Sequence, residues 1–557
     1  MNNEHNENKK KYEHNENNKS NKHGNSLALF LVGSLIMTSL WGCAAKKESD
    51  SQQLESTEVV EAVSENDDSI DGDSDNKDTT DENEASDTGS DVSEINGTAT
   101  ANSYKNNHLT FDDINIAENY EDDGDGSHAI TADGSDADYS DIAVYKTGEA
   151  DGDEADFYGE NAAIFATNGA TLTLSGIYVE SDGTHANGVF SYGEGTTVNI
   201  SDSVIETSGN CSGGLMTTGG GTMNASNLTI NTSGNSSAAI RSDRGGGTVN
   251  VEGGYYKTSG TGSPVIYSTA DITVSDSYLE STASQGVVVE GKNSVTLNDC
   301  ELVADNNTKN SDKSDTYQAV MIYQSMSGDA ANGTSSFNMT GGSLTNANGD
   351  IFFVNNTACT INLEDVIITN NDSDGVFLRA AAAGWGNSGS NGGKVALTAT
   401  NQNINGDMIV DDVSTLNLYL TNETAFVGAI NSDATAGEVY VELDETSTWT
   451  LTDDSYITSL TCVAGNINLN GHILYVNGEV YTEGSDSTGE AIEIVSENSS
   501  GESDMFDGEA PDGMPGDASG SSDGSGKPDG TSGEHGGTPP EKPSGDNGGT
   551  PPEKPDK

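Results

Sequence analysis

The sequence predicts an all-β fold, a right-handed parallel β-helix whose coils hold about 23–26 residues and three short strands each. The first observation is a recurring order of three apolar runs, as in Thr171–Leu174, Ile177–Val179 and Gly188–Ser191. The second is the composition between the runs, where Gly, Ser, Asn and Asp favour turns. The third is the lack of any long stretch with a 3.6-residue apolar period, which indicates very little helix.

The centre of the first run recurs at nearly constant spacing along the chain. The spacings are 26, 25, 26, 23, 23, 42, 24, 34 and 21 residues. The centres are Leu172, Val198, Met223, Val249, Ile272, Val295, Phe337, Ile361, Val395 and Leu416. Two spacings are long because insertions lie near Asp305–Thr316 and Ala380–Gly393. We therefore expect each strand to pair with its equivalent one coil away, at about 4.8 Å, with its aliphatic residues inside.

The repeats also set the limits of the predicted domain. We expect the β-helix to span residues 105–482, from a first coil near Leu109–Phe111 to closing coils that include Leu474–Val476. Leucine-rich repeats are the structural rival, but their Leu-x-x-Leu-x-Leu signature is missing. An antiparallel sandwich would not explain the fixed order of three runs.

An export signal precedes the repeats. Residues 26–42 form an apolar run that follows several lysines, which is typical of a signal peptide and short for a membrane span. The run ends in Leu40-Trp41-Gly42-Cys43, which resembles the bacterial lipobox. The resemblance implies removal of residues 1–42, a diacylglyceryl group on Cys43 and a lipid-anchored protein on the extracellular face of the bacterial cell membrane. An ordinary signal peptide or an uncleaved anchor is the alternative.

Acidic and low-complexity segments flank the predicted β-helix. Residues 48–94 contain 18 acidic residues and one lysine, which predicts a disordered tether over 43–104. Residues 483–557 are rich in Gly, Ser, Asp and Pro, which predicts a disordered tail. The net charge of −69 leaves no basic surface for phosphate contacts. This charge excludes nucleic acid as a partner and favours solubility and divalent cations.

Three acidic clusters before Leu172 are candidate Ca²⁺ sites. Their Asp-Gly-Asp turns supply the oxygen ligands that Ca²⁺ prefers, although none matches an EF-hand loop or an RTX repeat. A calcium site and solvated turns that cap the open end of the β-helix both remain open. The candidate ligands are Asp123, Asp125, Asp133, Asp136, Asp151 and Asp153.

No catalytic constellation stands out, so no catalytic residue is assigned. Gly471-His472-Ile473 is the nearest match to a polygalacturonase-type Gly-His-Gly, and it lies in the closing coils. A lyase or hydrolase that acts on acidic polysaccharide remains the alternative to a binding protein. The cysteines within the repeats show no metal-binding spacing, and we expect them to be small buried fillers without a disulfide. They are Cys211, Cys300, Cys359 and Cys462.

Aromatic and polar residues near strand ends are candidate carbohydrate contacts. Trp385 lies in the Gly-rich insertion, where a buried position is less natural than an exposed one. The alternative interpretation is that the tyrosine rings pack at the corners of the coils and their hydroxyls are exposed to solvent. The candidate ligand-binding residues are Trp385, Tyr192, Arg241, Tyr267 and Tyr323.

Repeated phrases such as Ala186–Gly193, Ser236–Gly245 and Met321–Gly328 resemble those of the adhesin-like surface β-helix lipoproteins of bacteria. That group overlaps with calcium-dependent carbohydrate-binding β-helix proteins, and Ser447–Thr452 is similar to the ends of autotransporter passenger domains. The resemblance implies a cell-surface adhesin or carbohydrate-binding module whose partner is extracellular polysaccharide or another cell. A Ca²⁺ cofactor and no cofactor both remain open. A structural surface spacer remains a second alternative.

Overall fold

The computed structural model describes residues 96–309, 311–434 and 437–494. The expected signal peptide, Cys43 with its lipobox, most of the tether and the tail from residue 495 lie outside these residues. Within the part of the chain that is described, no helix has the length and apolarity needed to cross a membrane.

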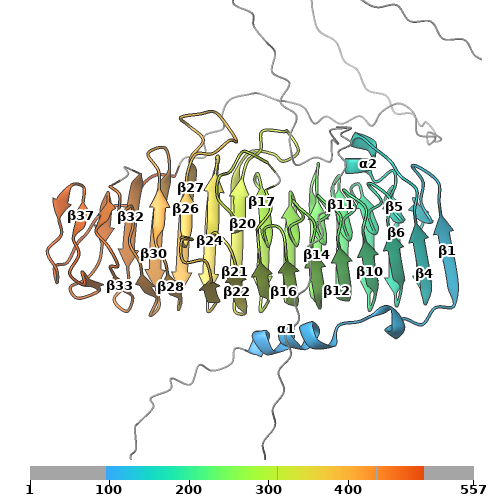
Figure 1. The fold of residues 1–557 in the computed structure, drawn as a ribbon, viewed down its shortest axis with the longest axis horizontal. Coiled ribbons are helices and arrows are strands. Elements are labelled where there is room, and N and C mark those ends of the chain that lie inside the picture. Colours follow the sequence, from blue (N-terminus) through green and yellow to red (C-terminus); the bar gives the residue numbers. More distant parts are fainter. Residues whose placement is uncertain (1–95, 310, 435–436, 495–557) are drawn as a thin grey trace, which may run out of the picture. The chain divides into compact units, whose positions relative to one another are not determined.

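The described residues form an all-β fold dominated by parallel sheets (Figure 1). Sheet A has 20 strands and sheet B has 11. A four-stranded sheet contains β28 (Asn403–Asn405), β31 (Ala425–Val427), β33 (Thr448–Thr450) and β36 (Ile467–Asn468). A three-stranded sheet contains β34 (Ser455–Ile457), β37 (Leu474–Val476) and β38 (Glu479–Val480). The predicted predominance of parallel strands is confirmed.

Sheet A holds the strands of the first and second runs. Leu172 pairs with Val198, and Val198 pairs with Met223, so equivalent residues of successive repeats lie side by side. The strands of the first run are β3 (Ala137–Ser140), β6 (Thr171–Ser175), β9 (Thr197–Ser201), β12 (Gly221–Thr232), β14 (Gly247–Thr258), β16 (Asp271–Ser281), β18 (Ser294–Asn298), β21 (Thr334–Thr340), β24 (Thr357–Glu364), β27 (Gly393–Thr400), β30 (Thr415–Thr421), β32 (Glu438–Leu443) and β35 (Ser459–Thr461). Separate strands of the second run are β1 (Glu118–Asp122), β4 (Ile142–Lys146), β7 (Tyr178–Ser181), β10 (Val204–Thr207), β19 (Glu301–Ala304), β22 (Ser343–Asn346) and β25 (Ile367–Asn370).

A single residue in the left-handed region bends the chain between the first and second runs. Asp202, Asn227 and Asp276 occupy this position with φ of 49°, 51° and 52°. Asn and Asp tolerate such values better than other residues with a side chain, which explains their recurrence there. β12 and β16 pass through this bend without interruption, and β14 does so at Gly253 and Gly254, which both have positive φ.

Sheet B holds the strands of the third run. Its strands are β2 (Ile130–Asp133), β5 (Ile164–Thr167), β8 (Val189–Tyr192), β11 (Leu215–Thr218), β13 (Ile240–Ser242), β15 (Ile266–Ser268), β17 (Val287–Glu290), β20 (Gln318–Tyr323), β23 (Asp350–Asn355), β26 (Leu378–Ala380) and β29 (Met408–Val410). Its inward residues, such as Val189, Leu215 and Ile240, belong to the same core as those of sheet A.

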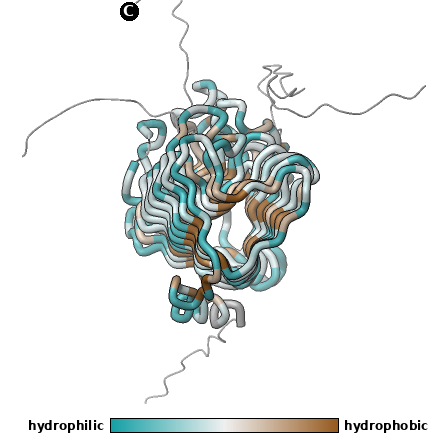
Figure 2. The backbone as a smooth tube through the Cα atoms, turned by 90° about the vertical axis from the view of Figure 1, so that its right-hand side faces the viewer, coloured by the Kyte–Doolittle hydropathy of each residue, from teal (hydrophilic) through white to brown (hydrophobic). Residues whose placement is uncertain are grey.

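The core is one continuous hydrophobic cluster, mostly aliphatic, between the sheets. All ten predicted centres of the first run are at most 1 % exposed and belong to it, which confirms the predicted inward set. Hydrophobic stretches line the inner side of the stacked chain (Figure 2). Burial of a Leu or Val side chain contributes about 1.5–3 kcal/mol, so this row is the main source of stability.

The N-terminal end differs from the prediction. Helix α1 (Asn96–Asn107) packs on β14 and β16, so the expected boundary at residues 104 and 105 falls inside a helix. No strand forms near Leu109–Phe111, where the first coil was expected to begin. Phe111–Asp113 form a 3₁₀ turn instead, and the Asp113 carboxylate accepts hydrogen bonds from the backbone and hydroxyl of Thr110 at its start. The first strand is β1.

The C-terminal end also extends beyond the expected limit of residue 482. Ile492 exchanges two hydrogen bonds with the side chain of Asn417, at 2.8 and 3.1 Å. Ser487 forms an antiparallel bridge with Cys462. Ser487 and Ile492, which belong to the predicted disordered tail, are thus held to the C-terminal end of the fold by hydrogen bonds of their backbone.

Candidate functional site

The outer face of sheet A carries an open trough of uncharged polar side chains. Asn199, Asn224 and Asn250 stand in register on β9, β12 and β14, and Thr173 and Thr273 continue the row on either side. The amide of Asn224 donates to Asn199 at 2.9 Å, and that of Asn250 donates to Asn224 at 3.0 Å. The trough has a volume of about 640 Å³. It therefore presents repeated amide and hydroxyl groups to solvent at the spacing of the strands.

Carboxylates flank this trough. Glu252 and Asp276 lie at its edge, where the sheet bends. Burial and the neighbouring carboxylates of Asp299 and Glu252 raise the pKa of Asp276. The negative potential of this edge disfavours an anionic ligand and leaves neutral ligands unaffected.

A second hollow of about 370 Å³ lies on the neighbouring rows of sheet A. Glu180 and Glu206 pair in register there, and the hydroxyl of Tyr178 donates to both, at 3.1 and 2.8 Å. Burial and the two carboxylates raise the pKa of Tyr178 well above its usual range. The cation in this hollow, Lys257, is paired with Glu280 at 3.1 Å.

The outer face of sheet B carries apolar and charged residues in one row. Phe190, Met216, Arg241, Tyr267 and Val288 pair in register from β8 to β17. All five side chains are buried. This row is covered, whereas the equivalent outer row of sheet A is open.

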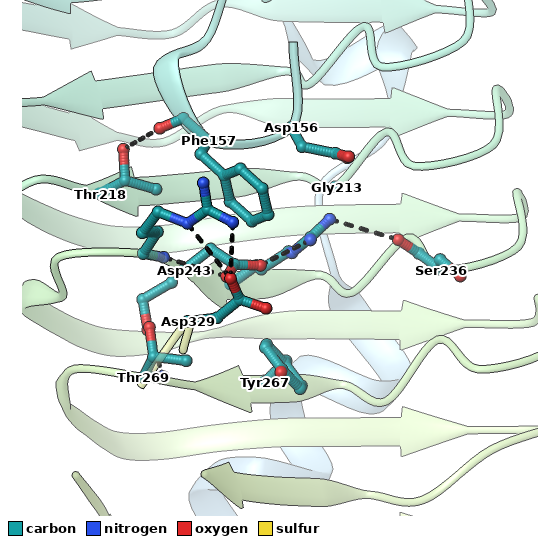
Figure 3. A network of polar contacts seen from close by, with 12 residues as sticks. Asp156, Phe157, Gly213, Thr218, Ser236, Asp243, Tyr267, Thr269 and Asp329 are labelled. Atoms are coloured by element: carbon teal, nitrogen blue, oxygen red, sulfur yellow. Dashed lines mark hydrogen bonds and ion pairs between the residues drawn. The ribbon is translucent and has the colours of Figure 1, made fainter. Parts of the chain in front are cut away.

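Helix α2 (Asp153–Tyr158) and a loop cover part of this face. The guanidinium of Arg244 lies 3.8 Å from the centre of the Phe157 ring and pairs with Asp329 at 2.8 Å and Asp153 at 3.2 Å. The hydroxyl of Thr218 donates to the Phe157 carbonyl at 2.6 Å (Figure 3). Arg244 therefore joins a short helix and a distant loop to sheet B.

Beneath this cover, Arg241 and Asp243 form an ion pair at 2.7 Å with both side chains 4 % exposed (Figure 3). Burial raises the pKa of Asp243 to about 7, because the attraction of Arg241 is opposed by the carboxylates of Asp329 and Glu290. The pKa of Arg241 is raised as well, so the guanidinium keeps its charge. Arg241 and Asp243 thus depend on each other, because loss of either side chain would leave the other buried without its partner.

Glu290 is the third buried carboxylate of the network. The hydroxyls of Tyr267 and Tyr323 donate to its Oε2 at 2.5 and 2.9 Å, and the backbone of Ser325 donates to Oε1. Burial still raises the pKa of this carboxyl despite the three donors. Glu290 links β17 to β20 below the covering loops.

Asp156 of α2 and His185 approach each other at the edge of the same face. Asp156 Oδ1 lies 2.9 Å from His185 Nδ1, and both side chains are buried. The sulfur of Cys211 lies within 4.8 Å of both groups. His185 and Cys211 occupy equivalent turn positions with φ of 57° and 58°.

Four of the five predicted ligand-binding residues lie on the outer face of sheet B and are more enclosed than expected. Tyr267, Tyr323 and Arg241 are buried in the network described above, and Tyr192 is half-buried against Tyr158. The hydroxyls of Tyr267 and Tyr323 and the guanidinium of Arg241 contact internal carboxylates, so these three residues are not arranged as an open sugar platform.

The expected exposure of Trp385 is wrong. Its side chain is 2 % exposed, packs edge-on against Tyr323 at 5.3 Å and lies under the ammonium of Lys313 at 5.8 Å. The two insertions meet here, because Gly384 donates to the Lys313 carbonyl at 2.7 Å. Contact between the insertions supplies the apolar cover that buries the indole.

The predicted calcium ligands do not converge among the described residues. All six are exposed, and several are engaged locally: Asp125 accepts from the Glu149 backbone, Asp133 from Asn168 and Asp136 from the Thr171 backbone. In the described ranges, the groups of three donors within 4.8 Å are Asp156–His185–Cys211 and Asp453–Asp454–His472.

The cysteines divide into two kinds. Cys300, Cys359 and Cys462 are free, buried and part of the core, as expected. Burial raises the pKa of Cys300 to about 12. Cys211 is disulfide-bonded, which corrects the expectation for this residue. Cys211 is buried at a turn and lies outside the main core cluster rather than in an inward row.

Sequence reasoning missed the buried network of sheet B. Asp243 and Glu290 belong to no sequence motif, and Asp156 lies in one of the acidic clusters for which a calcium site and solvated turns both remain open. One signal was present, because His185, Cys211 and Ser236 recur at equivalent turn positions.

Comparison of the chain with protein-family models, with curated proteins and with solved structures gave no match.

Proposed function

We propose that the protein is a cell-surface module that binds extracellular polysaccharide, and that its stacked sheets wind as a right-handed parallel β-helix. The winding is supported by the fixed order of three runs in each repeat and by the parallel pairing of successive repeats. Connections between parallel strands of one sheet are right-handed in nearly all known proteins.

The observation that carries the proposed binding function is the trough on sheet A. Its row from Thr173 to Thr273 repeats hydrogen-bonding groups at the strand spacing of about 4.8 Å, which is close to the length of one sugar unit in an extended chain. Amides and hydroxyls both donate and accept, as sugar hydroxyls do. A periodic polymer can therefore meet the same group at each step.

The charge around the trough selects the class of polysaccharide. Glu252 and Asp276 border it, and the chain as a whole carries a net charge of −69. An acidic polymer would be repelled at low ionic strength. We therefore propose a neutral polysaccharide, unless Ca²⁺ at the exposed carboxylates before Leu172 bridges an acidic one.

The proposed location rests on the sequence before the described residues. The apolar run 26–42 and the lipobox-like Leu40–Cys43 favour export and a lipid on Cys43. A lipid anchor would hold the trough outside the cell, where extracellular polysaccharide or another cell surface is within reach. Mass spectrometry of the mature N-terminus tests this: an unmodified Cys43, or a chain that retains residues 1–42, would contradict it.

A glycan array probed with the purified chain, with and without a chelator, tests the binding function. We expect neutral polysaccharides to bind in both conditions. Asn250→Leu, within the trough, should weaken binding, whereas Asn362→Leu should not, because Asn362 continues the same polar row outside the trough. Absence of binding to any plant, host or cell-wall glycan would reject the function and favour a structural spacer.

A glycoside hydrolase is the second candidate, favoured by one observation. Glu180 and Glu206 stand side by side in the second hollow with Tyr178 between them, and paired carboxylates are what glycoside hydrolysis requires. Release of reducing ends from neutral and acidic polymers tests it, with Glu206→Gln as the inactive control. A flat trace for the unmodified chain removes this candidate.

A further inference from the structure

A small polar pocket lies between the two insertions, beside the start of β20. Its volume is about 30 Å³, and its lining includes residues of both insertions and of the turn before β17. The polar lining residues that are more than nine-tenths buried are Ser284, Gln285, Asn306, Gln318 and Trp385. A pocket of this size holds about two water molecules, or the end group of a larger ligand.

Two of these residues carry a polar atom that has no partner within the described part of the chain. Neither Nε1 of Trp385 nor Oε1 of Gln318 forms a hydrogen bond, although both atoms are buried. The amides of Gln318 and Gln285 donate to the sulfur of Met321, at 3.4 and 3.8 Å, and a thioether sulfur is a weak acceptor. Since buried polar atoms are nearly always satisfied, an unpaired donor and an unpaired acceptor at one pocket indicate a missing group that both accepts and donates. A hydroxyl is such a group.

Hydrogen bonds fix the walls of the pocket. The buried amide of Asn391 donates to the carbonyls of Ala383 and Trp385, both at 2.7 Å, and so holds the second insertion around the indole. The amide of Asn306 donates to the Gln318 carbonyl at 3.2 Å. Because these bonds hold both residues in place, the missing partner of their unpaired atoms must come from outside the pocket.

The rim of the pocket carries an aromatic ring. Tyr317 lines the pocket and is half-buried, and its ring centre lies 6.0 Å from the ammonium of Lys309. Lys309 pairs with Asp315 at 3.8 Å, so this charge at the rim is balanced. An aromatic ring beside a few buried hydrogen-bonding groups is the combination that suits a sugar, whose ring has apolar faces and polar edges.

We propose that this pocket binds the hydroxymethyl group of a neutral hexose. The hydroxyl accepts a hydrogen bond from Nε1 of Trp385 and donates one to Oε1 of Gln318, while the sugar ring stays at the rim against Tyr317. A hydroxyl on the ring itself cannot enter, because the ring is too large for a pocket of about 30 Å³. A carboxylate cannot donate, so it would leave Gln318 unpaired. The pocket shares no lining residue with the trough on sheet A and does not depend on the function proposed for that trough.

Titration of the purified full chain with methyl glycosides tests the proposal. Methyl β-glucoside and methyl β-xyloside differ only in the hydroxymethyl group, and methyl β-galactoside and methyl α-L-arabinopyranoside form a second such pair. Trp385 and Trp449 are the tryptophans among the described residues, so tryptophan fluorescence follows binding. We expect at least one hexoside to change the fluorescence and to bind at least about tenfold more tightly than its paired pentoside. Trp449→Phe should keep this change, since Trp449 lies in the core.

Trp385→Phe keeps an aromatic ring and removes the N–H, and Gln318→Leu removes the acceptor. In calorimetric titrations each variant should bind the hexoside at least about tenfold more weakly and the pentoside as before, because only the hexoside uses these two atoms. Asn224→Leu, in the trough, should change neither affinity. If a variant fails to fold, the two sugar pairs on the unmodified chain still decide. No binding of either hexoside, equal affinities within both pairs, or full affinity of Trp385→Phe for the hexoside would overturn the proposal, and water would then fill the pocket.

Discussion

The outer faces of sheet A and sheet B are built from the same repeat but differ in the polarity and in the solvent exposure of their side chains. On sheet A the row from Thr173 to Thr273 is uncharged, open and satisfied by its own amides. On sheet B the corresponding row, from Phe190 to Val288, is apolar and charged, and lies under α2 and the loops. The inward rows of both sheets are alike. The strands therefore provide the scaffold, while the covering segments determine which face is accessible to a ligand.

The first prediction concerns the covered face. Arg241→Ala leaves Asp243 buried without its partner, which should lower the free energy of unfolding by about 3–5 kcal/mol. Lys257→Ala, in the more exposed pair on sheet A, should cost about 1 kcal/mol or less. Urea unfolding of both variants measures the difference. Equal effects would show that the two faces are energetically alike.

The second prediction is the pH dependence of the covered face. The carboxyl of Asp243 has an ordinary pKa of 3.8 and a folded pKa of about 7. Between these values the folded protein keeps a proton that the unfolded chain has lost, so the free energy of unfolding should fall as pH rises through this window. Since one pKa unit corresponds to about 1.4 kcal/mol, the fall should reach about 4 kcal/mol.

Asp243→Asn should flatten the profile of unfolding free energy from pH 4 to pH 7, and the difference between the two chains isolates this carboxyl from the many others. The raised pKa of Glu290 acts with the same sign in both chains. Parallel profiles for the variant and the unmodified chain would contradict a buried carboxyl at this position.

The third prediction concerns ionic selectivity on the open face. A neutral polysaccharide should bind at least tenfold more tightly than its carboxylated counterpart at low salt, because Glu252 and Asp276 border the trough. The preference should shrink as salt rises, since screening acts strongly on exposed charges. Binding measured at several ionic strengths checks this. A preference for the acidic polymer without added Ca²⁺ would contradict the proposed selectivity.

The smallest expected effect is the stability of the open face. Asn224→Leu removes hydrogen bonds to half-exposed neighbours, so the free energy of unfolding should change by about 1 kcal/mol or less. Thermal unfolding measures the change. A loss of several kcal/mol would mean that the amide row is structural rather than available for a ligand.

The inward pattern could be predicted from the sequence because alternation of apolar and polar residues determines which side chains face the core. Leu172, Val198 and Met223 were identified in this way, and so was the parallel stacking of equivalent runs. The ends were misjudged, because α1 and the segment up to residue 494 are held by tertiary contacts and not by a repeat.

The candidate site was harder to predict because its partners are far apart in the chain. Arg244 and Asp329 are separated by 85 residues, and Asp156 meets His185 only because α2 folds over sheet B. Trp385 was misplaced for the same reason, since its burial depends on contact between two insertions. The apolar periodicity within a run does not indicate which residues far apart in the chain come into contact.

The most direct test of the central claim is the affinity of a neutral oligosaccharide, chosen from the glycan array, for the unmodified chain, Asn224→Leu and Asn338→Leu. Both asparagines belong to the same polar row, but only Asn224 lines the trough. Calorimetric titration should show at least a tenfold loss for Asn224→Leu and no change for Asn338→Leu. Equal affinities for all three chains would contradict the assignment of the open face of sheet A as the binding surface.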